Sequence, residues 1–183
     1  MRLETSLGGY VPQSEDEGRD LERLRRLAAE SGDPWTRASA LHVTGSAVVV
    51  HPPTRRVLLR WHERMQAWLQ VGGHADPGEV DPFVIALREA REETGLGDLV
   101  AWPDPRTPRI VQVAVVPVPA GRGEAAHEHG DIRYALATAA PDLVVPESAS
   151  ALLTWLTIED ALERVAWDNL RICLERIAAL MNA

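Results

Sequence analysis

The sequence has a single cysteine, Cys173, among its 183 residues. One cysteine excludes an internal disulfide and a zinc site built from several thiolates. It lies in a segment with helical apolar spacing, LRICLERIAAL, so we interpret it as a core residue. The chain also lacks both a run of about 18–20 apolar residues and an apolar signal core near its start. These two absences predict a cytoplasmic protein with no membrane partner.

The sequence also has fewer basic than acidic residues. The chain has 19 basic and 27 acidic residues, which gives a net charge of −8. This balance disfavours binding to a nucleic-acid backbone or to an anionic membrane surface. A ligand that carries phosphate groups would therefore need a local device, such as a divalent cation.

The length predicts one main domain with an extension. Ser14 and Glu17 form a capping box, and apolar residues at helical spacing follow until Gly32. We expect residues 1–38 to be a helical extension with an amphipathic helix of about 17 residues. This helix would pack on the main domain, residues 39–183, or on a second copy of the chain in a homodimer.

The main domain alternates strand and helix patterns. Runs of β-branched and alternating residues predict strands near residues 42–50, 55–61, 67–71, 110–118, 131–139 and 151–156. Residues 121–130 have loop composition, and Thr157 is expected to cap a last helix from about residue 158 to 181. Interleaved strands and helices predict an α/β fold in which a mixed sheet lies between helices.

The strongest indication of a chemical function lies in residues 71–96, VGGHADPGEVDPFVIALREAREETGL. Asp81 followed by proline is typical of a helix start, and Gly95 of a helix end. Between them, Glu89, Glu92 and Glu93 fall within about 100° of arc on one side of the helix. Their repulsion destabilises the helix unless a cation binds them, and three carboxylates suit a hard divalent ion such as magnesium.

Two neighbours support this interpretation. Arg88 precedes Glu92 by four residues and could hold its carboxylate. Gly72 and Gly73 allow the main chain to pass close to the ion, where a carbonyl could become a further ligand.

These residues resemble the Nudix box, whose usual form is G-x5-E-x7-R-E-U-x-E-E-x-G-U with U aliphatic. Gly73 and Glu79 match its first half. The second half is matched by Arg88, Glu89, Ala90, Glu92, Glu93, Gly95 and Leu96. One departure is that eight residues, rather than seven, separate Glu79 from Arg88. We place the extra residue in the loop before Asp81, which leaves the orientation of Glu79 open.

The resemblance covers residues 40 to 160 and implies a Nudix α/β/α sandwich with a mixed sheet, plus the N-terminal helix. It implies hydrolysis of a diphosphate bond in a nucleoside diphosphate linked to another group, with Mg2+ or Mn2+. The metal ligands would be the Gly73 carbonyl, Glu89, Glu92 and Glu93, with Glu79 as an outer or second-metal residue. Arg88 would orient a glutamate. The base could be a box glutamate or come from a later loop, as Glu128 or Glu147.

Several residues outside the motif are candidates for substrate binding. Arg60 could bind phosphate, although a surface role is the default, and Trp61 or Trp68 could stack on a base. His129, Asp131 and Arg133 would share one face of a strand and line the pocket. His127 and His129 could also bind a metal, but we favour an exposed loop pair.

The main alternative is a Nudix domain that binds a nucleotide or nucleotide sugar as a sensor without hydrolysing it. The intact box argues against this alternative. A cysteine-dependent isopentenyl diphosphate isomerase is rejected, because Cys173 is far from any matching motif.

Overall fold

A long strand, β1 (Leu41–His51), organises the molecule. The computed structural model describes residues 3–121 and 123–182. In it, β1 pairs in parallel with β7 (His127–Ala137) along almost its whole length. Both strands are buried over most of their residues, as expected of strands covered on both faces. Together they form the centre of an eight-stranded sheet.

The other strands extend the sheet on both sides, in the order β3-β2-β1-β7-β5. They are β2 (Arg56–His62), β3 (Ala67–Leu69), β4 (Val71–His74), β5 (Val100–Ala101), β6 (Gln112–Val118) and β8 (Leu153–Thr157). Strand β4 pairs with the first half of β1, whereas β2 pairs with its second half. Strand β6 pairs with β7, and β8 with β2. Parallel and antiparallel pairs therefore make the mixed sheet that the sequence predicts.

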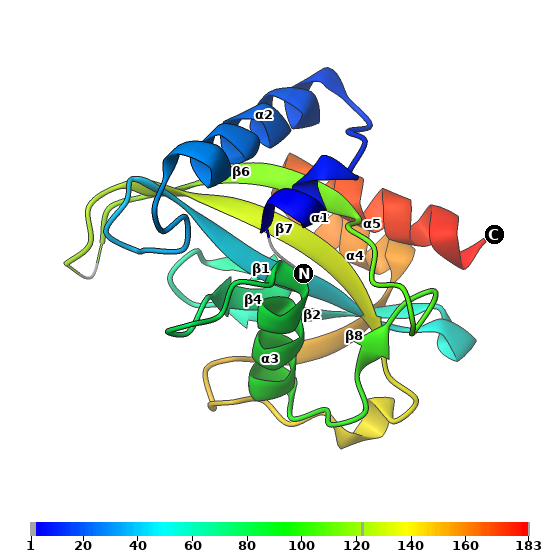
Figure 1. Cartoon of the computed structure of the whole chain (residues 1–183). Helices are drawn as coiled ribbons and strands as arrows, with labels where there is room; N and C mark the ends of the chain where they lie inside the picture. Colours follow the sequence, from blue (N-terminus) through cyan, green and yellow to red (C-terminus); the bar gives the residue numbers. More distant parts are fainter. Residues whose placement is uncertain (1–2, 122, 183) are drawn as a thin grey trace.

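Helices cover both faces of the sheet. One face carries α1 (Leu3–Gly8), α2 (Glu15–Glu30) and α3 (Pro82–Thr94), and the other carries α4 (Ile158–Arg164) and α5 (Asp168–Met181) (Figure 1). Short 3-10 turns lie at η1 (Pro52–Thr54) and η2 (Pro141–Leu143). The expected α/β/α sandwich is confirmed.

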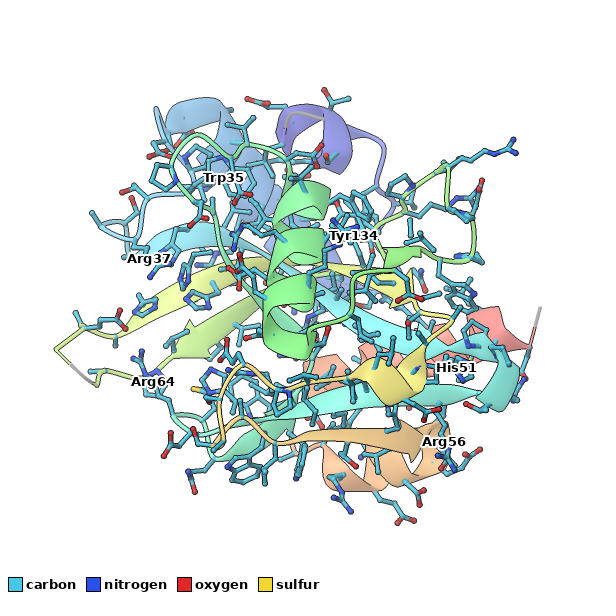
Figure 2. All side chains as sticks on the ribbon, turned by 90° about the horizontal axis from the view of Figure 1, so that it is seen from below. Trp35, Arg37, His51, Arg56, Arg64 and Tyr134 are labelled. Carbon is cyan, nitrogen blue, oxygen red and sulfur yellow. The ribbon has the colours of Figure 1, made fainter. Side chains whose placement is uncertain are left out.

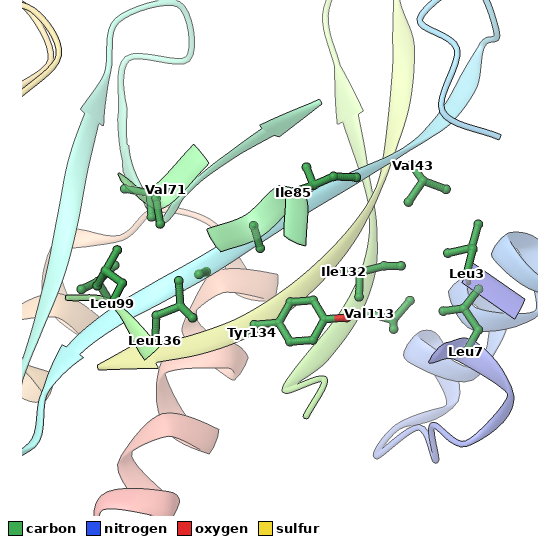
Figure 3. Packing of buried hydrophobic residues seen from close by; sticks show 14 of the residues in the cluster. Leu3, Leu7, Val43, Val71, Ile85, Leu99, Val113, Ile132, Tyr134 and Leu136 are labelled. Carbon is green, nitrogen blue, oxygen red and sulfur yellow. The ribbon is translucent and has the colours of Figure 1, made fainter. Parts of the chain in front are cut away.

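Each face has its own apolar core. Leu3 and Leu7 of α1 share one core with Ile85 of α3 and Ile132 of β7 (Figure 3). The N-terminal helices therefore pack on the main domain. Helix α3 comes so close to the sheet that a Cβ on Gly45 would lie 2.5 Å from the Pro82 carbonyl oxygen. No larger residue fits at position 45 without moving α3 away from the sheet.

Two predicted boundaries are wrong. The last helix is broken at residues 165–167, where Val165 is extended, and the break lets α5 bury Leu170 and Ile177 against the sheet. The segment 127–130, expected to be a loop, is the beginning of β7. Backbone pairing with β1 and β6 overrides its loop-like composition.

A buried ion pair links helix α2 to helix α5. Glu17 of α2 accepts hydrogen bonds from both terminal nitrogens of Arg176, each at 2.8 Å, and from Tyr10 and the Val113 amide. Burial alone would raise the pKa of Glu17, but these donors outweigh it and lower the pKa to about 2. The carboxylate is therefore charged and fully paired inside the protein.

Among residues 3–121 and 123–182, no helix is both long enough and apolar enough to cross a membrane.

Candidate active site

Helix α3 has the boundaries that its sequence signals predict. The Asp81 side chain accepts a hydrogen bond from the Phe83 amide at 3.0 Å, and Gly95 ends the helix with φ of 69°. Ile85, Ala86 and other small apolar residues face the sheet. This orientation turns Glu89 and Glu93 toward the backbone of β4.

The two glycines of β4 make room for these glutamates. An added Cβ on Gly73 would lie 2.6 Å from the Glu89 carboxylate, so a side chain there would occupy the place of that carboxylate. The Gly72 amide donates a hydrogen bond to Glu93 Oε2 at 3.0 Å. Gly72 has φ of 148°, which larger residues rarely adopt. The expected close approach of main chain and carboxylates is present.

Arg88 holds the remaining carboxylates of the motif. Its guanidinium donates to Glu79 at 2.9 and 3.0 Å, to Glu89 at 3.0 Å and to Glu92 at 2.9 Å. It also binds the His74 carbonyl oxygen at 2.7 Å. The hydrogen bonds from Arg88 lower the pKa of Glu79. The extra residue before Asp81 thus leaves Glu79 oriented toward Arg88.

Glu93 is the most buried of these glutamates, with 10% of its side chain exposed. Burial raises its pKa to about 7, although the nearby charge of Arg60 opposes the shift. Arg60 Nε lies 3.4 Å from Glu93 Oε1, and this nitrogen is buried without a hydrogen-bond partner. The far end of the Arg60 guanidinium pairs with Glu147. Glu93 therefore has less compensation than a buried charge needs.

The donor set fits a divalent cation. Glu89 and Glu93 lie against the glycine backbone with their oxygens only partly hydrogen-bonded, and burial also raises the pKa of Glu89. Carboxylate and carbonyl oxygens are the ligands that magnesium and manganese prefer. Positive charge here would offset the burial of both glutamates.

A cleft of about 600 Å3 adjoins this cluster. Gly72 and Gly73 line it on one side, together with Arg60 and Glu147. Its floor is a polar network centred on Asp131. That carboxylate accepts hydrogen bonds from Thr44, Ser46, Gln70 and Arg133 at 2.8–3.0 Å. Gln70 Oε1 is buried there without a partner.

The structure brings some of the expected substrate residues together and separates others. Arg60, Glu147, His129 and Arg133 all line the cleft. The default surface role of Arg60 is wrong, because only 15% of its side chain is exposed.

Trp68 and Glu128 differ from expectation. Trp68 packs in the core beside α4 and α5, under the Arg164 guanidinium, and Trp61 lines the cleft instead. Glu128 points to the other face of β7, where it pairs with Arg23 of α2. Successive residues of a strand face opposite sides, so Glu128 points away from its neighbours His127 and His129.

The sequence interpretation missed a cluster of four histidines, three of which, His74, His127 and His129, line the cleft. Four rings come from three strands: His42 on β1, His74 on β4, and His127 and His129 on β7. Burial, the largest cause, lowers the pKa of His74 to about 3 and of His129 to about 4. The favoured exposed loop pair is wrong. The signal that could have found the cluster was histidine at three strand ends.

Comparison with known proteins adds a family. A model of the NUDIX domain matches residues 41–175. No curated protein matches the chain in sequence.

Solved structures of the same fold include an Ap4A hydrolase of C. elegans, with a TM-score of 0.59 and 20% identity over 76% of this chain and 97% of that one. The dihydroneopterin triphosphate pyrophosphohydrolase of E. coli aligns with a TM-score of 0.55 and 19% identity, over 77% and 96%. The Nudix hydrolase RenU of M. smegmatis gives 0.55 and 23%, over 77% and 86%. At these identities the likeness establishes the fold alone.

Proposed function

The chain belongs to the Nudix family, and we propose that it is a metal-dependent hydrolase of a diphosphate bond in a nucleoside diphosphate linked to another group. Nudix hydrolases act on anhydrides of phosphoric acid. The observation that carries the proposal is the placement of Glu89 and Glu93 against Gly72 and Gly73, beside a cleft that Arg60 enters. Carboxylates with this little compensation suit a cation site better than a structural role.

The metal would be held by Glu89, Glu92, Glu93 and the Gly73 carbonyl, and we favour Mg2+ or Mn2+. When bound, such an ion polarises a phosphoryl group and lowers the pKa of water. Arg88 keeps Glu89 and Glu92 in place through its hydrogen bonds. The Arg88 bond to the His74 carbonyl ties this arrangement to β4.

The cleft supplies groups for both ends of the substrate. Arg60 offers positive charge to a phosphate at the mouth of the cleft. Glu147 lines the same space with 40% of its side chain exposed, so it can take a proton from an attacking water. Glu147 is therefore our candidate base. We set Glu128 aside for that role, because it pairs with Arg23 on the other face.

The floor of the cleft suits a polar group beyond the diphosphate. Gln70 Oε1 is a buried acceptor without a partner, and a hydroxyl or amino group of the substrate would satisfy it. Trp61 at the rim offers a flat surface for a base. A nucleoside-like group meets both requirements.

The test is a panel of substrates with and without Mg2+ or Mn2+. The panel contains nucleoside triphosphates, ADP-ribose, dinucleoside polyphosphates, nucleotide sugars and dihydroneopterin triphosphate. Wild type is compared with Glu93→Gln and with Glu175→Gln, an exposed glutamate of α5 outside the cleft. We expect metal-dependent turnover of one class by wild type and Glu175→Gln, with severe loss in folded Glu93→Gln. A compound that raises the melting temperature without any turnover would contradict the hydrolase and favour a sensor.

A further inference from the structure

The histidine cluster unites residues that are far apart in sequence. The register of β1 places His42 directly opposite His129 on β7, and places Thr44 opposite His74 on β4. His127 lies two residues before His129 and faces the same side. The four rings have centroids 4.7–5.3 Å apart in the contacts that join them.

One ligand nitrogen from each of His42, His74 and His129 lies within 4.8 Å of the other two, and His127 contacts His129 beside them. The separations are 3.1 Å between His74 and His42, 3.2 Å between His74 and His129, and 3.1 Å between His127 and His129. Zinc binds imidazole nitrogen at about 2.0–2.1 Å in a tetrahedron, so two such ligands lie about 3.3 Å apart. The observed separations are slightly shorter than this, so these nitrogens need only small outward movements to reach the spacing of ligands in a tetrahedral zinc site.

Hydrogen bonds at the other ring nitrogens set the tautomers. His42 Nδ1 donates to the Ser39 carbonyl at 3.0 Å, and His127 Nδ1 donates to the Ala125 carbonyl at 2.9 Å. In a neutral ring the proton on Nδ1 leaves a lone pair on Nε2. Such backbone bonds are the usual partners of histidines that bind metals through Nε2.

Hydrogen bonds among the rings alone cannot satisfy this arrangement. If His42 and His127 accept at Nε2, then His74 and His129 must donate to them. Those two donors face each other at 3.2 Å, and their contact is repulsive. A cation at the centre turns each Nε2 into a ligand and removes the conflict.

We propose that His42, His74 and His129 bind a divalent ion of the zinc class, with His127 available as the fourth ligand. Imidazole suits zinc, copper, nickel and iron, whereas the carboxylates of α3 suit magnesium and manganese. His74 adjoins Gly73, so the two sites lie side by side on β4 but differ in donor chemistry. His74, His127 and His129 line the cleft, which gives the ion a route of entry.

The first test measures zinc affinity. Untagged full-length protein, stripped with EDTA, competes with a chromophoric chelator for Zn2+. Variants are His129→Ala and His74→Ala, and the matched control is His51→Ala. His51 lies at the opposite end of the sheet from Arg64, which lines the cleft (Figure 2). We expect one tight equivalent in wild type and in the control, and a loss of at least about 100-fold in the two cluster variants. Unchanged affinity in these variants would overturn the proposal.

The second test needs no variant that might fold poorly. X-ray absorption of the wild-type zinc complex should show three or four imidazole nitrogens at about 2.0–2.1 Å. A shell of oxygen ligands would place the ion elsewhere and overturn the proposal.

The two proposals fail separately. Glu93→Gln should lose diphosphate turnover and keep the zinc affinity of wild type. Loss of tight zinc binding in folded Glu93→Gln would place the zinc on α3 and overturn the histidine site.

Discussion

Two buried glutamates, Glu17 and Glu93, each lie beside an arginine, but their pKa values are shifted in opposite directions. Glu17 has 4% of its side chain exposed and Glu93 has 10%. Glu17 receives two charged hydrogen bonds from Arg176, one from Tyr10 and two from backbone amides. Glu93 receives one backbone hydrogen bond, and the nearest nitrogen of Arg60 is 3.4 Å away.

The pKa values follow from this difference. Hydrogen bonds lower the pKa of Glu17 to about 2 against the effect of burial, whereas burial raises that of Glu93 to about 7. A carboxylate whose hydrogen bonds all come from the protein itself stabilises the packing of two helices. A buried carboxylate with too little positive charge nearby suits a site where a ligand supplies that charge. We therefore propose a structural role for Glu17 and a metal-binding role for Glu93.

The strongest way to break this comparison is Glu93→Gln. Loss of a metal ligand should reduce turnover by about a thousand-fold, while the amide can still accept from the Gly72 amide and the fold remains. Steady-state kinetics with Mg2+, together with circular dichroism, measure both effects. Turnover within ten-fold of wild type would end the assignment of Glu93 as a metal ligand.

The converse change is Glu17→Gln. It leaves Arg176 without a full partner inside the protein and should lower the free energy of unfolding by about 3 kcal/mol. For a chain of this length that corresponds to a melting temperature about 6–12 °C lower. Turnover at a temperature where both proteins are folded should stay near wild type. A large kinetic loss without a thermal shift would show that the two glutamates are not distinct in role.

Acid titration sharpens the same contrast. The folded pKa of Glu17 is below its ordinary value of 4.5, so its contribution to stability is present above about pH 4.5 and is lost as pH falls through about 2. Wild type and Glu17→Gln should therefore converge in stability across this window. Urea unfolding at several pH values measures the gap, and a gap that stays constant down to pH 2 would contradict the ion pair.

A smaller effect is expected from Gly73→Ala. The added Cβ would lie only 2.6 Å from the Glu89 carboxylate, so it would displace that carboxylate without removing a charge. We expect a turnover loss of roughly 10- to 100-fold, typical of changes that misplace a metal ligand. Ala75, the next small residue after His74, provides a control as Ala75→Gly. Equal rates for the two variants would argue against the glycine contact.

The sequence predicted best what is local. The boundaries of α3 and the hydrogen bonds from Arg88 to Glu89 and Glu92 follow from helical spacing and caps. These are short-range properties, so a single segment contains the needed information. The sandwich also followed, because strand and helix patterns alternate along the chain.

The sequence did not predict the contacts that depend on strand register. Glu128 and His129 are neighbours in sequence, yet β7 turns them to opposite faces, and the strand begins four residues earlier than its composition indicates. The proximity of Glu147 to Arg60, and of His42 to His74, depends on how distant strands and loops align. Such contacts depend on the register of the whole sheet, which no local pattern of this sequence contains.

The most direct measurement is a titration of metal-free protein with Mn2+. Electron paramagnetic resonance of the free ion reports how much Mn2+ is bound. Wild type, Glu93→Gln and Glu17→Gln are compared in the same buffer. We expect wild type and Glu17→Gln to bind Mn2+ with the same affinity, and Glu93→Gln to bind it at least about ten-fold more weakly. Equal binding by Glu93→Gln and wild type would contradict a cation site on α3.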